Sequence, residues 1–361
     1  MPAHYTHSFF VFEALSQINR SDLFQQQLTP WFILGAQGPD MFYHGLRTKP
    51  SSIALGSLLH RHSYGSFSAN LLSQCVSGDH GPASPLGAYT LGFISHGILD
   101  RYLHPFINYF SGWQEQGNPE SEQFRYAHSF YERIIDLEVT QLPGWKQLQT
   151  IWGLIAPGSQ MNFNHSIDLG TTIPPILLDH LQQALLSTYP KLAKDSLLSQ
   201  RIQNSYLDTL GFYRYCDWWI QNQANQSTAD SSSLNHDSVR WLSLVHPQAL
   251  PSDQDFLNLK HEIWIDPCGL GEETSQDLWA LYDLAMDRLT SIYEQLLDLW
   301  EQGIVASDFP GIAPLIGDSD LRNTYEDVML CKLTVAKPKH IRRILEQLAT
   351  GIIPDHWNRF Y

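Results

Sequence analysis

Cysteine is scarce in this sequence, and the few cysteines lie far apart. The chain of 361 residues has four of them and no Cys-x-x-Cys pair. Disulfide frameworks are typical of small secreted domains, and thiolate zinc sites need closely spaced cysteines, so the sequence argues against both. We expect free thiols in a reducing compartment at all four positions, which are Cys75, Cys216, Cys268 and Cys331.

Positive charge is also scarce. Lysine and arginine total 22 against 37 aspartates and glutamates, which gives a formal net charge of −15. The densest basic cluster is the short segment 337–343. A protein that binds duplex nucleic acid needs a basic surface, so we expect no long nucleic acid as a partner. The same charge disfavours tight adsorption to an anionic bilayer, and we expect at most peripheral membrane contact.

The sequence has no long apolar run. None of its segments approaches the ~18–20 apolar residues that span a bilayer. The first residues, MPAHYTH, lack the basic stretch followed by an apolar stretch that marks a signal peptide. We therefore expect a cytoplasmic protein without a transmembrane segment.

The residues that are present indicate an all-α fold. Hydrophobic residues make up 43% and charged residues 16%, so the chain is apolar enough to fold. The segments between prolines and glycines have a helical period, and few of them alternate in the manner of strands. We expect helices over residues 8–28, within 31–45, and over 86–103, 118–140, 174–189, 195–222, 275–302 and 339–348. The helix over 86–103 should end there, because the residue before Pro105 is pushed out of helical geometry.

A polar, serine-rich segment over residues 224–238 is the best linker in the chain. We expect a first helical body over residues 1–223, with a metal cluster between its helices. A C-terminal helical region over residues 239–361 should pack on this body. The helix over 275–302 has the clearest apolar stripe, and Gly303 is placed to terminate it.

Histidine is concentrated in the first part of the chain. Nine of the 16 histidines lie within the first 128 residues. Two of them lie on either side of an aspartate: His96, Asp100 and His104 are spaced at i, i+4 and i+8. On an α-helix these positions fall within about 80° of one another, on one face. Imidazole and carboxylate are ligands that zinc accepts besides thiolate, so this face predicts a metal site.

A second candidate pair follows on the next expected helix. His128 and Glu132 are again spaced at i, i+4, and Asp136 lies one turn further. Such a pair is common on an ordinary solvated helix, but its position after the first helix favours a shared metal site. Asp136 is a candidate for orienting a ligand histidine.

Further candidates lie upstream of the first helix face. Asp40 follows Gly38 and Pro39, a rigid turn that can direct a carboxylate inward, although a simple turn cap is the alternative. His60 and His62 end an apolar stretch, and we expect one of the two to be a ligand.

These motifs occur in an order that resembles the bacterial zinc-dependent phospholipase C family. The resemblance covers roughly residues 1–140, and the ordered set is more specific than any one motif. Its elements are Met1-Pro-Ala-His-Tyr-Thr-His7, Gly35-Ala-Gln-Gly-Pro-Asp40, Leu59-His60, Gly92-Phe-Ile-Ser-His96-Gly-Ile-Leu-Asp100, His104-Pro105 and His128-x-x-x-Glu132. The first motif favours His7 as a ligand over His4, which we expect at the surface.

The resemblance implies an all-helical enzyme in which zinc ions at three sites activate water for attack on a phosphodiester, and we expect about two to three of these ions to be bound. The implied ligands are Asp40, His60, His96 and Asp100 for one ion; His7 and a bridging Asp100 for a second; and His104, His128 and Glu132 for a third. Asp40 is also implied as the catalytic carboxylate that orients or deprotonates the water. The amine of Pro2, exposed once Met1 is removed, is a further candidate ligand.

Three functions remain open from the sequence. The leading one is a zinc phosphodiesterase of the phospholipase C type, acting on a phospholipid or related phosphodiester. The second is a nucleotide or nucleic-acid-end phosphoesterase with the same kind of cluster. The third is a non-catalytic helical protein that keeps a metal for structure. A full ligand set beside Asp40 favours an active site over a structural one. The spacing of the ligands does not distinguish zinc from manganese or iron.

Overall fold

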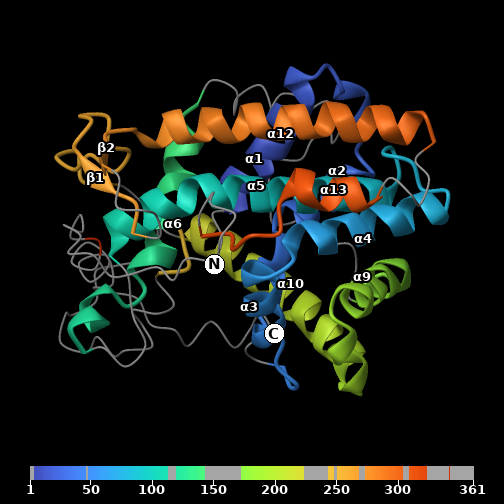
Figure 1. Ribbon diagram of the computed structural model, residues 1–361. Helices are drawn as coiled ribbons and strands as arrows, with labels where there is room; N and C mark the ends of the chain where they lie inside the picture. Colours follow the sequence, from blue (N-terminus) through green and yellow to red (C-terminus); the bar gives the residue numbers. More distant parts are fainter. Residues whose placement is uncertain are drawn as a thin grey trace.

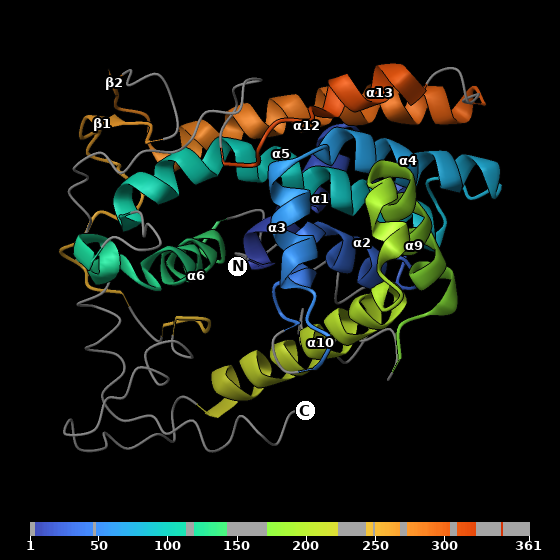
Figure 2. The ribbon, with the colours of Figure 1, turned by 60° about the horizontal axis from the view of Figure 1, so that its bottom comes forward.

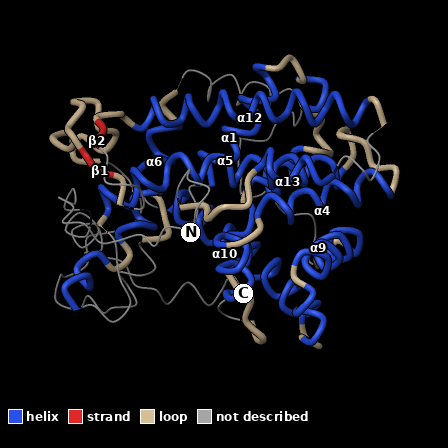
Figure 3. Tube along the Cα trace, in the orientation of Figure 1, coloured by secondary structure: helices blue, strands red, loops and turns tan. Residues whose placement is uncertain are grey.

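The computed structural model confirms an all-α fold. It describes residues 4–45, 48–112, 119–142, 172–222, 243–247, 250–267, 273–303, 309–322 and 341. Within these residues the β-structure is one short antiparallel pair, in which Trp264–Ile265 (β1) pairs with Glu273–Thr274 (β2) at one end of the molecule (Figure 3). No described helix is both long and apolar enough to cross a membrane.

The long helix α5, Pro85–Ser111, lies at the centre of the fold (Figure 1). The Ser84 side chain starts it by accepting a hydrogen bond from the Gly87 amide at 3.1 Å, with Pro85 in the first turn. Almost every residue of α5 is buried, as expected for a helix covered on all sides. The helices that contact it are α1 (His4–Gln17), α2 (Thr29–Ala36), α4 (Tyr64–Ser77), α6 (Ala127–Val139) and α12 (Leu278–Glu301).

Helix α2 crosses α5 at unusually close range. A Cβ on Gly35 would lie 2.2 Å from the Tyr89 carbonyl oxygen, and one on Gly92 would lie 2.5 Å from that of Phe32. The two backbones touch because neither glycine has a side chain. This crossing fixes the 3-10 helix η2, Gly38–Phe42, against the middle of α5.

The remaining helices enclose this centre on two sides. Helix α12 runs along α5, and α13 (Phe309–Ile316) packs on α4 (Figure 1). The buried Arg101 of α5 donates hydrogen bonds to the carbonyls of Ile316 and Gly317, which ties the end of α13 to the centre. Helices α9 (Pro175–Thr188) and α10 (Leu198–Asn222) lie on the side of α5 opposite α12 (Figure 2). The short helices α3 (Ile53–Arg61), η1 (Ser21–Leu23), η3 (Pro119–Phe124) and η4 (Pro190–Lys194) complete the described part.

Three expected helix boundaries are wrong. Helix α1 begins at His4 and ends at Gln17, because Asn19 adopts a positive φ of 59° that interrupts the helix. Helix α5 does not stop before Pro105 but continues to Ser111. The expected single helix over 118–140 is two elements, η3 and α6, because Tyr126 has a φ of 67°.

Other expected elements cannot be placed. The linker over 224–238 and the final helix over 339–348 lie outside the described residues, apart from Ile341. The division into two domains therefore stays a prediction.

Candidate metal centre

Five elements bring the eight predicted ligands together. Helix α1 supplies His7, η2 supplies Asp40 and α3 supplies His60. The structure joins them to residues of α5 and α6 in three groups whose ligand atoms lie within 4.8 Å of one another. The groups are His7, His96 and Asp100; Asp40, His60 and His96; and His104, His128 and Glu132.

Asp100 lies at the centre of these groups. Its Oδ2 is 3.0 Å from His96 Nε2, and its Oδ1 is 3.3 Å from His7 Nε2 and 3.6 Å from His104 Nε2. The i, i+4, i+8 spacing on α5 thus places one carboxylate between two imidazoles, as the sequence predicted. Because His7 approaches from α1, the carboxylate also joins two helices.

The other two carboxylates each join neighbouring elements. Asp40 Oδ1 is 3.0 Å from His60 Nε2, and Asp40 Oδ2 is 3.6 Å from His96 Nε2. Glu132 Oε1 is 2.9 Å from His128 Nε2 on the same helix and 3.6 Å from His104 Nε2 on α5. Gly38 is required for the approach of Asp40, because it has a φ of 54° and a Cβ there would lie 2.3 Å from the His96 ring.

Backbone carbonyls orient three of the histidine rings. The Nδ1 atoms of His60, His96 and His104 lie 2.8, 3.1 and 2.9 Å from the carbonyl oxygens of Gly56, Ala36 and Leu321, respectively. A carbonyl oxygen can only accept, so each Nδ1 carries a proton, and Nε2 is the ring nitrogen that can bind a metal ion once its own proton has left. This is the arrangement by which proteins fix the tautomer of metal-binding histidines.

The electrostatics of the centre favour bound cations. Burial acts to raise the pKa of Asp40 and Asp100, but the neighbouring imidazoles, His60 and His104 foremost, hold both pKa values below their usual range. Burial acts to lower the pKa of His104, yet Asp100 and Glu132 raise it to about 9. Buried carboxylates that stay ionised beside these imidazoles are available to bind metal cations.

Two observations show that these residues fit a metal ion: some of their buried ligand atoms lack a hydrogen-bond partner, and their donor atoms are ones that metals accept. His96 Nε2 and Asp100 Oδ2 are fully buried, and neither makes a well-aligned hydrogen bond. Within the described residues, Asp40 and Asp100 form ion pairs with histidines and with no arginine or lysine. Nitrogen and oxygen donors without thiolate suit zinc, manganese or iron. The described residues could therefore hold several metal ions.

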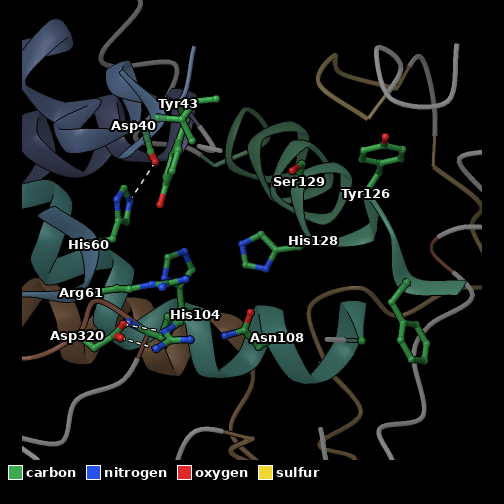
Figure 4. Close-up of a pocket in the computed structure, with 14 residues that line it drawn as sticks. Asp40, Tyr43, His60, Arg61, His104, Asn108, Tyr126, His128, Ser129 and Asp320 are labelled. Atoms are coloured by element: carbon green, nitrogen blue, oxygen red, sulfur yellow. Dashed lines mark hydrogen bonds and ion pairs between the residues drawn. The ribbon is translucent and has the colours of Figure 1, made fainter. Parts of the chain in front are cut away.

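A pocket of about 480 Å³ opens onto the centre. The rings of His60, His104 and His128 enter it from α3, α5 and α6, and Asp40 lies beside His60 (Figure 4). His7, His96 and Asp100 lie deeper, outside its lining. Two of the three groups, those that contain His60 and His104, therefore border the pocket, whereas the group of His7, His96 and Asp100 is buried in the helical body behind them.

The structure separates the alternative histidines. His60 is buried in the centre, whereas His62 caps the end of α3 at the surface. His44 is buried, and its Nδ1 lies 3.1 Å from the Thr209 hydroxyl rather than in a metal group. Pro2 lies outside the described residues.

A fourth group was not predicted from the sequence. His4, expected at the surface, is 1% exposed and lies with Asp136 and His246 in a buried cluster. Asp136 contacts His246 Nε2 at 2.9 Å and accepts hydrogen bonds from the Thr6 amide and hydroxyl, so it orients none of the predicted ligands. The reason is tertiary: His246 comes from a segment remote in sequence.

This fourth group already contains a cation. Arg133 Nη1 lies 2.5 Å from His4 Nδ1 and 3.3 Å from Asp136 Oδ2. The guanidinium, fully buried, neutralises the carboxylate between the two rings. The cluster is therefore a structural ion pair that fixes α1 on α6, and its geometry does not favour a metal.

Comparisons of the chain with protein-family models, with curated proteins and with solved structures gave no match. The case for a function therefore depends on the geometry of the centre and on the sequence motifs.

Proposed function

We propose that the protein is a zinc-dependent phosphodiester hydrolase of the phospholipase C type. The observation that carries this proposal is that three imidazole–carboxylate groups are linked through His96 and Asp100, and that two of these groups border one pocket. When bound there, zinc ions would supply charge neutralisation for the phosphate and activation of the attacking water. The eight residues that would hold them are His7, Asp40, His60, His96, Asp100, His104, His128 and Glu132.

The role assigned to Asp40 follows from its position. It is the aspartate that belongs both to a metal group and to the pocket lining. Its low pKa, set by His60 and His96 against the effect of burial, keeps the carboxylate ionised at neutral pH. Its oxygens can therefore accept a hydrogen bond from a water in the pocket and orient that water toward a phosphate.

The remaining residues hold this arrangement in place. The backbone carbonyls of Gly56, Ala36 and Leu321 keep the rings of His60, His96 and His104 aimed at the centre. The burial of His96 and Asp100 excludes solvent from the deep side. Together they preorganise the site before a substrate enters.

The open pocket favours a hydrolase over a purely structural metal site. Structural zinc sites are closed by four protein ligands, whereas catalytic sites keep a position for water or substrate. Here His60, His104 and His128 all border the pocket. Substrate access to the ligands is what catalysis requires and what a structural site avoids.

The test is hydrolysis by protein loaded with zinc. Substrates would be bis(p-nitrophenyl) phosphate and vesicles of phosphatidylcholine or phosphatidylglycerol. We expect phosphodiester cleavage to a phosphomonoester and an alcohol. Asp40→Asn should reduce kcat/KM by about 10²–10⁴-fold. The exposed Asp22→Asn should leave it unchanged.

Either of two results would contradict the proposal. Zinc-loaded wild type that cleaves none of these phosphodiesters would remove the assignment as a hydrolase. Full activity in Asp40→Asn would remove the role of this carboxylate while leaving the reaction in place.

A further inference from the structure

The mouth of the pocket carries two guanidinium groups in a protein of net charge −15. Arg61 is the last residue of α3, directly after the candidate ligand His60, and Arg322 follows α13. Both line the pocket above the metal centre, and the Arg61 side chain extends past His60 toward the His104 ring (Figure 4).

Hydrogen bonds to the backbone of Leu321 hold this part of the rim against the centre. The Leu321 amide donates to the His60 carbonyl at 2.8 Å, and the Leu321 carbonyl accepts from His104 Nδ1 at 2.9 Å. The segment 320–322 is thereby attached to two elements that carry candidate ligands. The positions of Asp320 and Arg322 relative to the pocket floor are fixed as a result.

The acidic side chains of the rim and floor already have partners. Asp320, 1% exposed, accepts from Arg322 Nε at 2.9 Å and from Arg322 Nη2 at 2.5 Å. Asp40 belongs to the metal centre. Arg61, by contrast, is exposed and forms no ion pair within the part of the chain that the structure describes.

Arg61 shares the pocket wall with an aromatic side chain, Tyr43, whose ring packs against that of His60 at a centroid distance of 4.9 Å. Tyr43 lines the same pocket beside Asp40 (Figure 4). The aromatic ring by itself could bind a cationic head group, but the positive charge of Arg61 would repel such a head group.

We propose that Arg61 selects substrates that carry a phosphate monoester in addition to the phosphodiester at the metal centre. A guanidinium binds phosphate with two parallel hydrogen bonds, which suits a charge at the mouth of a pocket whose floor binds another phosphate. This inference rests on the proposed function for the identity of the scissile group. The second phosphate belongs either to a lipid head group or to a nucleotide.

The experiment measures binding, so that it does not depend on turnover. Zinc-loaded protein is titrated by calorimetry with two ligand pairs that differ by one phosphate. The pairs are inositol 1-phosphate with inositol 1,4-bisphosphate, and adenosine 5′-monophosphate with adenosine 3′,5′-bisphosphate. We expect the bisphosphate of at least one pair to bind about 10-fold more tightly at low ionic strength.

Substitutions test whether Arg61 causes the tighter binding of the bisphosphate. Arg61→Gln should abolish it, and Arg61→Lys should keep only part, because an ammonium is a point charge without the planar fork. Arg20→Gln is the matched control: it changes the net charge equally at a surface ion pair with Asp22 and Glu301, outside the pocket lining, and should keep the full gain.

Each outcome decides the proposal. A gain in the inositol pair assigns a lipid head group as the source of the phosphate, and a gain in the adenosine pair assigns a nucleotide; either supports Arg61. Absence of a gain or of binding in both pairs, or a gain that survives Arg61→Gln, overturns it. Preferential bisphosphate binding by a protein that cleaves no phosphodiester would support Arg61 and contradict the hydrolase.

Discussion

Arg133 carries a full positive charge in the interior of the protein, between α1 and α6. Asp136 neutralises it, and His4 and His246 complete the polar surroundings of this pair. In the metal centre the carboxylates pair with histidines instead. One arginine thus accounts for the difference between a structural cluster and a candidate metal site built from the same residue types.

Substitution of Asp136 tests this difference. Asp136→Asn leaves Arg133 buried without its counter-charge and should lower the free energy of unfolding by about 3–5 kcal/mol. The exposed pair of Asp22 with Arg20 provides the control, and Asp22→Asn should cost less than about 1 kcal/mol. Urea unfolding measures both. Equal, small effects would show that the buried pair contributes no more than the exposed one.

Spacing in the sequence predicted which side chains lie together where these side chains belong to one helix. His96, Asp100 and His104 lie on one helix, so their common face follows from 3.6 residues per turn. The contact of His4 with His246 could not be predicted, because no periodicity relates residues so far apart. The order of α5 and α6 along the chain favoured their approach, whereas the approach of α1, η2 and α3 to them was suggested by the family resemblance.

At the scale of helices, the α2–α5 crossing determines where Asp40 lies relative to His96. Gly35 and Gly92 allow the two backbones to touch, and η2 follows α2 directly. Any residue that separates these helices should also move Asp40 away from α5.

Gly92→Ala is the corresponding prediction. The added methyl would lie 2.5 Å from the Phe32 carbonyl oxygen, so the helices must separate, at a cost of about 3 kcal/mol in the free energy of unfolding. Gly81→Ala is the control, because a Cβ there meets nothing within 4 Å, and its effect should stay within about 0.5 kcal/mol. Thermal or urea unfolding of the two variants compares them, and indistinguishable stabilities would refute the close crossing.

Helix α9 supplies a prediction about pH. His180 packs beneath Thr90, and burial foremost, with the charge of His80, lowers its pKa from 6.5 to about 4. The unfolded chain binds this proton near pH 6.5 and the folded chain only near pH 4. The stability contributed by neutral His180 is therefore present above pH 6.5 and is lost as the pH falls toward 4.

The expected loss is about 3 kcal/mol, since one pKa unit corresponds to about 1.4 kcal/mol. Urea unfolding of wild type and His180→Gln across pH 4 to 7 measures this loss. The difference between their free energies of unfolding at each pH isolates His180, because all other groups titrate in both proteins. A difference that does not change with pH would show that His180 titrates normally.

Helix boundaries were predicted less well than helix positions. Pro105 lies inside α5 because tertiary contacts outweigh its local effect: Trp264 of β1 packs on Phe106, Tyr109 and Phe110 just beyond it. Helices α3, α4 and α13 were not predicted at all. The ends of α1 and the break at Tyr126 depend on single residues with positive φ, which propensity does not reveal in advance.

At the scale of the molecule, acidic charge and buried histidines are consistent with a protein that binds cations. The formal charge of −15 is counted without metal ions, and the described structure concentrates part of it at one centre. The all-α prediction is confirmed. The zinc, the reaction and the cytoplasmic location stay predictions, because composition and geometry do not identify a metal, a substrate or a compartment.

The most direct test of the central claim is the metal content of the purified protein, measured by plasma mass spectrometry. We predict about two to three zinc ions per chain. His96→Ala and His128→Ala should each lose part of this load, whereas His246→Gln, in the cluster that contains Arg133, should keep all of it. A wild-type protein without metal, even after zinc is supplied during expression, would contradict the account.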